Sequence, residues 1–298
     1  MNEKNPILFG ANVDPNANQV QTAFEHARIA DTTGYDLITI QDHPYNKHFL
    51  DTWTLLSALA AVTERVHLGT NVANLPLRPP AMLAKQAASL DLISNGRMEL
   101  GLGAGAFWQG VAAYGGPERS GKEAYEAFKE AVHIMRAMWK GGSVKFDGTY
   151  YQVKGALAGP VPTRNIPIWV GGLGPKMLNF TGQMADGVLL SITYVPPENL
   201  TWANEQIDAG AAEAGRPTTA IRRGYNVMGA ITANGKGSTS QQSGIIGPVS
   251  YWVDTLQQLN EQYRQDTFIF WPVVEDKSGQ FELFANQVIP NMQAAQAK

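Results

Sequence analysis

The stretch IPIWVGGLGPKMLNFTGQMADGVLL at residues 166–190 decides the fold. Its first apolar run, residues 168–170, is typical of a buried parallel strand because β-branched and aromatic residues fill it. The run ends in a glycine cluster, formed by Gly171, Gly172 and Gly174, where the backbone can approach a ligand closely. Pro175 then suits the first turn of a helix, whose free N–H groups form an anion site. A second apolar strand, residues 188–190, completes the unit. Such a loop can also be a simple tight turn, so the rest of the chain has to decide.

Apolar runs alternate with amphipathic stretches along the whole chain, and this alternation predicts the fold class. The predicted strands are residues 7–11, 36–40, 66–69, 97–103, 168–170, 188–190, 223–231 and 267–271, each followed by a helix. Eight alternations in 298 residues fit a (β/α)₈ TIM barrel better than a Rossmann sheet of five or six strands. We therefore predict a single α/β domain over residues 1–298.

Three segments depart from this alternation. Asp147-Gly148 between two β-forming runs indicates a hairpin within an insertion at about residues 140–166, and we expect that insertion on the C-terminal face of the barrel. Residues 104–120 and 234–247 are predicted to be loops, because glycine and polar residues interrupt any period in them. These three segments are where substrate contacts are expected.

Composition narrows the class of protein. A formal net charge of −3 with scattered Lys and Arg argues against nucleic-acid binding. Zero cysteines exclude disulfides, thiolate metal sites and a cysteine nucleophile. No signal peptide or membrane-spanning run is visible, so we expect a cytoplasmic protein without a membrane partner. The five histidines are scattered without ligand spacing, and we predict no metal site.

In a barrel of this kind ligands bind at the C-terminal ends of the strands, and the candidate residues are those that follow the predicted strands. His43 could relay protons because imidazole titrates near neutral pH. In the alternative reading, Asp42 and His43 only close a strand end, with Asp42 accepting backbone N–H bonds. Asn71 and Asn74 could bind the polar edge of a ring or simply form a turn. The aromatic rings expected to line a substrate pocket are Phe107, Trp108 and Trp271.

Four motifs in this order resemble the luciferase-like monooxygenase superfamily along essentially the whole chain. They are DHP at 42–44, LGTNV at 68–72, GRMELGLGAG at 96–105 and GGLGPKMLNFTGQMADGVLL at 171–190. The resemblance implies a TIM-type barrel that binds a flavin or the deazaflavin coenzyme F420 at its mouth. GPKML followed by ADGVLL looks most like the deazaflavin-dependent reductases and dehydrogenases of the superfamily.

In that branch the cofactor phosphate lies on two glycine loops, and a non-prolyl cis peptide presses on the back of the ring. The resemblance places the phosphate on Gly171, Gly172 and Gly174, with Pro175 and Lys176 beside them, and on Ala104 and Gly105. It places the cis peptide at Asn71-Val72. One departure matters: the sugar-phosphate dehydrogenases of the branch carry an acidic residue where this chain has Ala106, which puts a glucose-phosphate substrate in doubt.

We predict an oxidoreductase that binds F420 and transfers hydride to or from a small organic substrate, with His43 and Asp42 as catalytic residues. The alternative is an FMN-dependent two-component monooxygenase that uses molecular oxygen and needs a separate flavin reductase. A third possibility is a non-catalytic flavin-binding relative. The presence of His43 and of the glycine loops argues against it. We also expect a homodimer, whose apolar surface would come from Leu55, Leu56, Leu59, Leu83, Leu90 and Ile93.

Overall fold

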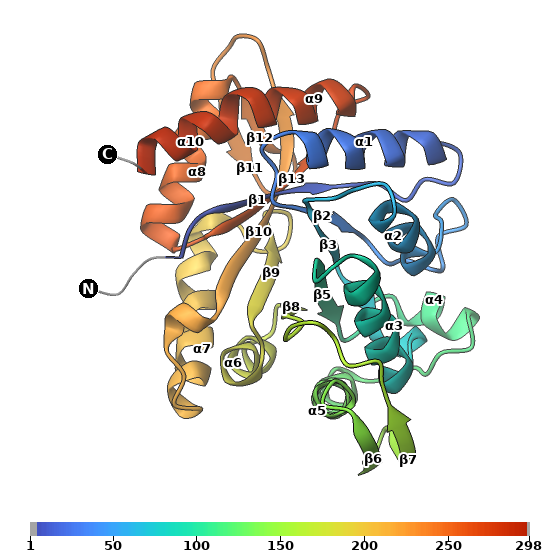
Figure 1. Cartoon of the computed structure of the whole chain (residues 1–298). Helices are drawn as coiled ribbons and strands as arrows, with labels where there is room; N and C mark the ends of the chain where they lie inside the picture. The colour runs from blue at the N-terminus through green and yellow to red at the C-terminus, as the bar shows by residue number, and fades with distance from the viewer. Residues whose placement is uncertain (1–4, 297–298) are drawn as a thin grey trace.

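The chain forms a closed barrel of eight parallel strands, as the alternation predicts (Figure 1). The computed structural model describes residues 5–296. The ring runs β1 (Leu8–Asn12), β2 (Leu37–Ile40), β3 (His67–Thr70), β5 (Met98–Gly103), β8 (Ile168–Gly171), β9 (Gly187–Ser191), β10 (Arg222–Ile231) and β13 (Thr267–Pro272). β13 pairs with β1 from Leu8↔Thr267 onward and closes the ring. Each predicted barrel strand is present, with its ends shifted by at most one residue.

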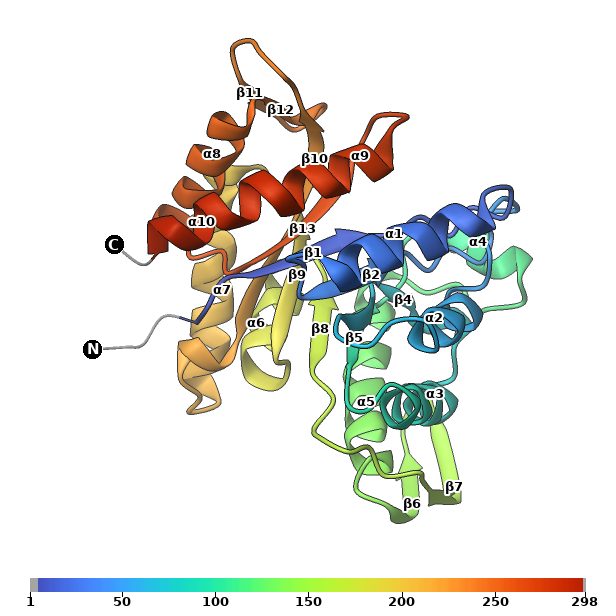
Figure 2. The ribbon, with the colours of Figure 1, turned by 45° about the horizontal axis from the view of Figure 1, so that its top comes forward.

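Helices cover the outside of the barrel and bury their apolar faces against the strands. They are α1 (Val20–Thr32), α2 (Thr52–Ala60), α3 (Pro80–Ile93), α5 (Gly121–Met138), α6 (Pro175–Met184), α7 (Leu200–Glu213), α8 (Val249–Tyr263) and α9 (Lys277–Leu283). The last predicted helix is interrupted, because a π-helical turn at Phe284–Val288 joins α9 to α10 (Ile289–Gln296). Figure 2 shows α9 lying beside α1 on the β1–β13 side of the barrel, with α10 continuing toward α8.

The interior of the barrel is packed, and its N-terminal end is sealed. Trp169 and Leu189 point inward with Ile269 and form a small apolar cluster. Gly187 has to be small there, because a Cβ on it would lie 2.3 Å from the Trp169 ring. Beneath this cluster Glu99 is buried and accepts hydrogen bonds from the Trp169 indole and from Arg164, both at 2.8–2.9 Å. These side chains fill the N-terminal part of the barrel interior, so we look for the ligand site at the C-terminal end of the strands.

The insertion does not lie where the sequence analysis expected it. Its hairpin, β6 (Gly142–Asp147) and β7 (Gln152–Ala158), is present, but it packs on the outer side of α5 and not on the C-terminal face (Figure 1). Glu130 in the middle of α5 accepts the N–H groups of Thr149, Tyr150 and Tyr151 at the turn. Arg164, just after the hairpin, binds the Met98 carbonyl at the start of β5. The insertion therefore belongs to the barrel wall and its N-terminal end.

Two predicted loops contain regular structure. Residues 104–120 include a short helix, α4 (Trp108–Ala113), and residues 234–247 form the strands β11 (Ser238–Ser240) and β12 (Gly244–Gly247). β12 extends the sheet by pairing with the end of β10. Both segments follow strand ends at the barrel mouth, so the C-terminal face is enclosed by these two segments and not by the insertion.

The leucines proposed as a dimer surface are used inside the chain. Leu55, Leu56, Leu59, Leu83 and Leu90 are buried in the core, and only Ile93 of that set is exposed. Their apolar stripe is the face that α2 and α3 turn toward the barrel. Within residues 5–296, no helix combines the length and apolarity needed to cross a membrane.

Candidate functional site

The centre of the barrel mouth is built around Val72. The Asn71–Val72 peptide bond is cis, as the resemblance implied, and it precedes the two-residue strand β4 (Ala73–Asn74). The Val72 side chain lies between the ends of β5 and β8. A Cβ on Gly103 would come within 2.7 Å of Val72 Cγ2, and one on Gly171 within 2.9 Å. These two strands end in glycine because the Val72 side chain occupies the space that larger residues would fill.

A belt of amide side chains crosses the mouth beside Val72. Asn71 Nδ2 donates to Asn226 Oδ1 at 2.6 Å and lies 3.3 Å from Thr39 Oγ1. The Thr39 hydroxyl donates to Asn12 at 3.2 Å, and Asn12 donates to Gln41 at 3.0 Å. The sequence analysis found Asn71 but missed Asn12, Gln41 and Asn226. Each of these residues is a polar side chain in or next to an otherwise apolar strand. Because side chains alternate between the two faces of a strand, their positions could have been predicted to face the barrel interior.

Asp42 is buried and fully engaged in a structural contact. Arg78 holds its carboxylate with Nε at 2.7 Å and Nη2 at 2.8 Å, and the Asn74 N–H adds a third bond at 2.9 Å. Arg78 also binds Asp51, the residue that caps α2. The geometry of Asp42 therefore matches the alternative in which it closes the strand end, and it makes no hydrogen bond to His43.

His43, in contrast, is exposed at the mouth. Its Nδ1 lies 3.0 Å from the Tyr45 hydroxyl, and its ring packs 6.4 Å from Phe49, centroid to centroid. Burial of the ring's protein-facing side lowers the pKa of His43, and the nearby Asp42 carboxylate partly offsets that effect. A neutral imidazole therefore faces the mouth at pH 7, where it can exchange a proton with a bound molecule.

The glycine loop after β8 leads directly into α6. Gly171 and Gly172 are half-buried, while Gly174, Pro175 and Lys176 are exposed. A Cβ on Gly174 would meet nothing within 4 Å, so there is open space at the start of the helix. Lys176 makes no ion pair with any residue from 5 to 296. The loop therefore offers free N–H groups and one cation to an anion.

The second predicted loop lies after the neighbouring strand, β5. Ala104 and Gly105 are half-buried, and Gly105 has φ +102°, a conformation that favours glycine. The Trp108 ring covers Gly105, because a Cβ there would lie 2.8 Å from that ring. Since β5 and β8 are paired, the two glycine loops lie at adjacent strand ends.

These features fit a flat tricyclic ring with a phosphate-bearing side chain. Val72 offers an apolar surface for one face of the ring, and the amides of Asn71 and Asn226 match the donor and acceptor edge of its pyrimidine part. The open start of α6 suits the phosphate. Asn74 Oδ1 is buried beside the mouth and has no hydrogen-bond partner among residues 5–296. A bound molecule could donate the hydrogen bond that this oxygen lacks.

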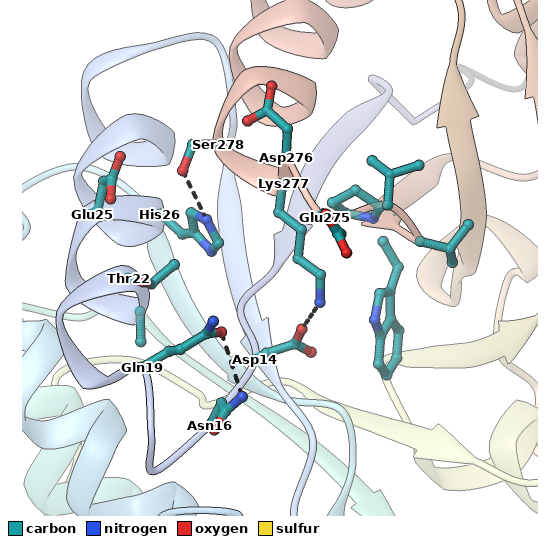
Figure 3. A pocket seen from close by; sticks show the side chains of 15 residues that line it. Asp14, Asn16, Gln19, Thr22, Glu25, His26, Glu275, Asp276, Lys277 and Ser278 are labelled. Atoms are coloured by element: carbon teal, nitrogen blue, oxygen red, sulfur yellow. Dashed lines mark hydrogen bonds and ion pairs between the residues drawn. The ribbon is translucent and has the colours of Figure 1, made fainter.

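A cavity with a volume of about 800 Å³ lies on the β1–β13 side of this face. Figure 3 shows Lys277 pointing to Asp14 and His26 pointing to Ser278 across it. Trp271 lines this cavity, whereas Phe107 and Trp108 do not. Phe107 instead packs against Tyr45 at 5.1 Å between ring centroids. The three predicted pocket aromatics are therefore not brought together in one pocket.

No group of His, Asp or Glu in the described part of the chain has the geometry of a metal site. The four acidic residues in the cavity are not arranged as ligands, because Asp14 is paired with Lys277 and Asp276 caps α9.

Comparison with known proteins identifies relatives across the chain. The family model for luciferase-like monooxygenases matches residues 6–265. A 5,10-methylenetetrahydromethanopterin reductase of Archaeoglobus fulgidus is 33% identical over 218 residues, 72% of this chain. An F420-dependent glucose-6-phosphate dehydrogenase of Nocardia farcinica is 33% identical over 204 residues, 66% of this chain. The matched region spans 61% of the length of each of these two relatives.

Solved structures share the whole fold. An F420-dependent secondary alcohol dehydrogenase, solved with an F420-acetone adduct, superposes with a TM-score of 0.85 at 19% identity, covering 97% of this chain and 99% of that one. The coenzyme F420-dependent tetrahydromethanopterin reductase of Methanopyrus kandleri gives 0.84 at 22% identity, covering 97% and 100%. These similarities confirm the predicted TIM barrel.

Proposed function

The chain belongs to the luciferase-like monooxygenase family, and on that premise we propose that it is a coenzyme F420-dependent oxidoreductase that acts on a small organic substrate. The observation that carries the proposal is the barrel mouth, where Val72 lies between two strand-end glycines and the open start of α6 adjoins them. The reductase and the dehydrogenase similar to this chain support F420 over FMN. When bound, the deazaflavin supplies hydride chemistry.

Each part of the mouth has its own role in this proposal. The N–H groups at the start of α6 and the loop around Gly105 bind the phosphate. Val72 supports one face of the ring, and the belt of Asn71 and Asn226 orients its polar edge. His43 exchanges a proton with the substrate, since it is an exposed titratable residue two positions after Gln41 of the belt. Asp42 is assigned a positioning role, because its carboxylate is held by Arg78.

The cavity next to the mouth bears on the substrate. Asp14, Glu25, Glu275 and Asp276 outnumber the single lysine in its lining. An anionic sugar phosphate is disfavoured at such a surface, in agreement with the doubt raised by Ala106. We propose an uncharged small molecule as substrate. The homodimer and the cytoplasmic location stay predictions, and the F420 assignment makes a separate flavin reductase unnecessary.

Titration of the purified protein with F420 and, in parallel, with FMN tests the proposal. The deciding variant is Gly174→Asp, compared with Gly174→Asn as an uncharged control of the same size. Both side chains fit the open position and cap α6 well. We expect Gly174→Asp to weaken F420 binding at least about tenfold by repulsion of the phosphate. The proposal fails if F420 does not bind the unaltered protein, and the phosphate site fails if the two variants bind F420 equally.

A further inference from the structure

Among the side chains of residues 5–296, Tyr45 alone forms a hydrogen bond with the His43 ring. The Tyr45 hydroxyl lies 3.0 Å from Nδ1, and the two ring centroids are 5.6 Å apart. Nε2 has no hydrogen-bond partner within residues 5–296, so it is the nitrogen left for a bound molecule. We propose that Tyr45 is a positioning residue that holds His43 by Nδ1 and fixes its proton on Nε2.

The Tyr45 ring is itself held in place from the α4 side. Phe107 meets it edge-to-face at an interplanar angle of 70°. Gly110 of α4 packs directly on it, since a Cβ at Gly110 would lie 2.8 Å from Tyr45 Cγ. A phenol fixed in this way restricts the rotation of the imidazole to which it is bonded, and so pre-organises the nitrogen that faces the substrate.

The direction of the hydrogen bond follows from the chemistry of its two partners. Burial raises the pKa of Tyr45, so the phenol keeps its proton at neutral pH. A phenol is a stronger acid than the N–H of a neutral imidazole, and the bare imidazole nitrogen is a stronger base than a phenol oxygen. The Tyr45 O–H therefore donates to His43 Nδ1, from which it lies 3.0 Å.

A neutral imidazole that accepts at Nδ1 carries its proton on Nε2. The titratable groups that face this pair are few: Asp42 acts on His43, while Asp42 and Tyr194 act on Tyr45. Arg78 neutralises Asp42. Under the function proposed above, on which this step rests, Nε2–H donates a hydrogen bond to the substrate oxygen and polarises it.

The test is NMR of the protein labelled with ¹⁵N-histidine and prepared without cofactor. We expect the His43 resonances to show a protonated Nε2 and a bare Nδ1. In Tyr45→Phe, which keeps the ring packing, we expect a mixture of tautomers and a rise in the pKa of His43, because the donor that favours the neutral form is gone. Tyr114→Phe, which removes the hydroxyl of an exposed tyrosine in the same region, should leave the His43 signals unchanged.

A proton on Nδ1 in the unaltered protein would overturn the proposal, as would identical His43 spectra in Tyr45→Phe. Kinetics add a second readout: Tyr45→Phe should lower kcat about tenfold with KM nearly constant. Since the spectra need no cofactor, they stand even if F420 does not bind. Failure of the proposed function and failure of this inference are therefore distinguishable.

Discussion

At the scale of single residues, Asp42 and His43 follow each other at the end of β2 and yet have separate roles. Asp42 turns into the protein, where Arg78 binds both of its oxygens. His43 is exposed, and the Tyr45 hydroxyl is the one side-chain hydrogen-bond partner of its ring within residues 5–296. Adjacent residues leaving a strand point to opposite sides, so two titratable groups in one motif need not share one function.

Asp42→Asn tests the structural role of Asp42. Removing the carboxylate leaves the Arg78 guanidinium without its buried partner, so we expect a loss of about 3 kcal/mol in the free energy of unfolding, measured with urea. Asp51→Asn is the matched control: it breaks the exposed pair with the same arginine, keeps a good helix cap, and should cost less than about 1 kcal/mol. Full stability of Asp42→Asn together with lost activity would instead make Asp42 a catalytic residue.

At the scale of elements, one carboxylate of α5 binds the turn of the β6–β7 hairpin, whose Val144 and Val153 are also buried in the core. Glu130 accepts three successive N–H groups of the hairpin turn, at 2.7–3.0 Å. This attachment explains why the insertion lies along the barrel wall. The mouth is enclosed instead by α4 and by β11–β12, which follow β5 and β10.

Glu130→Ala should loosen the turn of the hairpin without affecting the mouth. We expect a loss of about 1–2 kcal/mol in the free energy of unfolding, since three N–H groups lose their acceptor. Amide exchange at residues 149–151 should become faster, while F420 affinity stays unchanged. Glu126→Ala, which breaks only a surface pair with Lys129 on the same helix, is the control and should cost about 0.5 kcal/mol or less. If Glu130→Ala weakened F420 binding and Glu126→Ala did not, the insertion would contribute to the cofactor site after all.

At the scale of the whole molecule, ring closure makes the eight strands one cooperative unit. β1 pairs with β2 on one side and with β13 on the other, so the first and last strands hold each other. The Glu99 cluster closes one end of the barrel and leaves the other for ligands. A single unfolding transition is expected from this architecture, in line with the prediction of one domain.

F420 should stabilise this unit as a whole. At a cofactor concentration of 100 times Kd, we expect the free energy of unfolding to rise by about 2.7 kcal/mol in one transition. Tryptophan fluorescence and far-UV circular dichroism should report the same midpoint. At the same F420 concentration, the free energy of unfolding of Gly174→Asp should rise by less. Two transitions, only one of which responds to F420, would contradict the single domain.

The amino-acid sequence by itself determined the order of the elements and the family. Periodicity is a local property, so the strands and helices of the ring could be read within a few residues of their ends. The glycine loop at residues 171–174 was also readable, because a strand that stops at glycines before Pro175 is a local signal. The cis peptide at Asn71–Val72 was instead placed by the resemblance of its motif to the superfamily.

Tertiary structure alone decided which side chains meet. Asn71 binds Asn226, 155 positions away, and Asp42 binds Arg78, 36 positions away. Such pairs form only when the ring closes and brings distant strand ends to one face, and no local period encodes them. Burial of the α2 and α3 leucines and the position of the hairpin depend in the same way on what each element packs against. The sequence determines which face of each helix or strand is apolar, and the closed barrel determines which residues that face contacts.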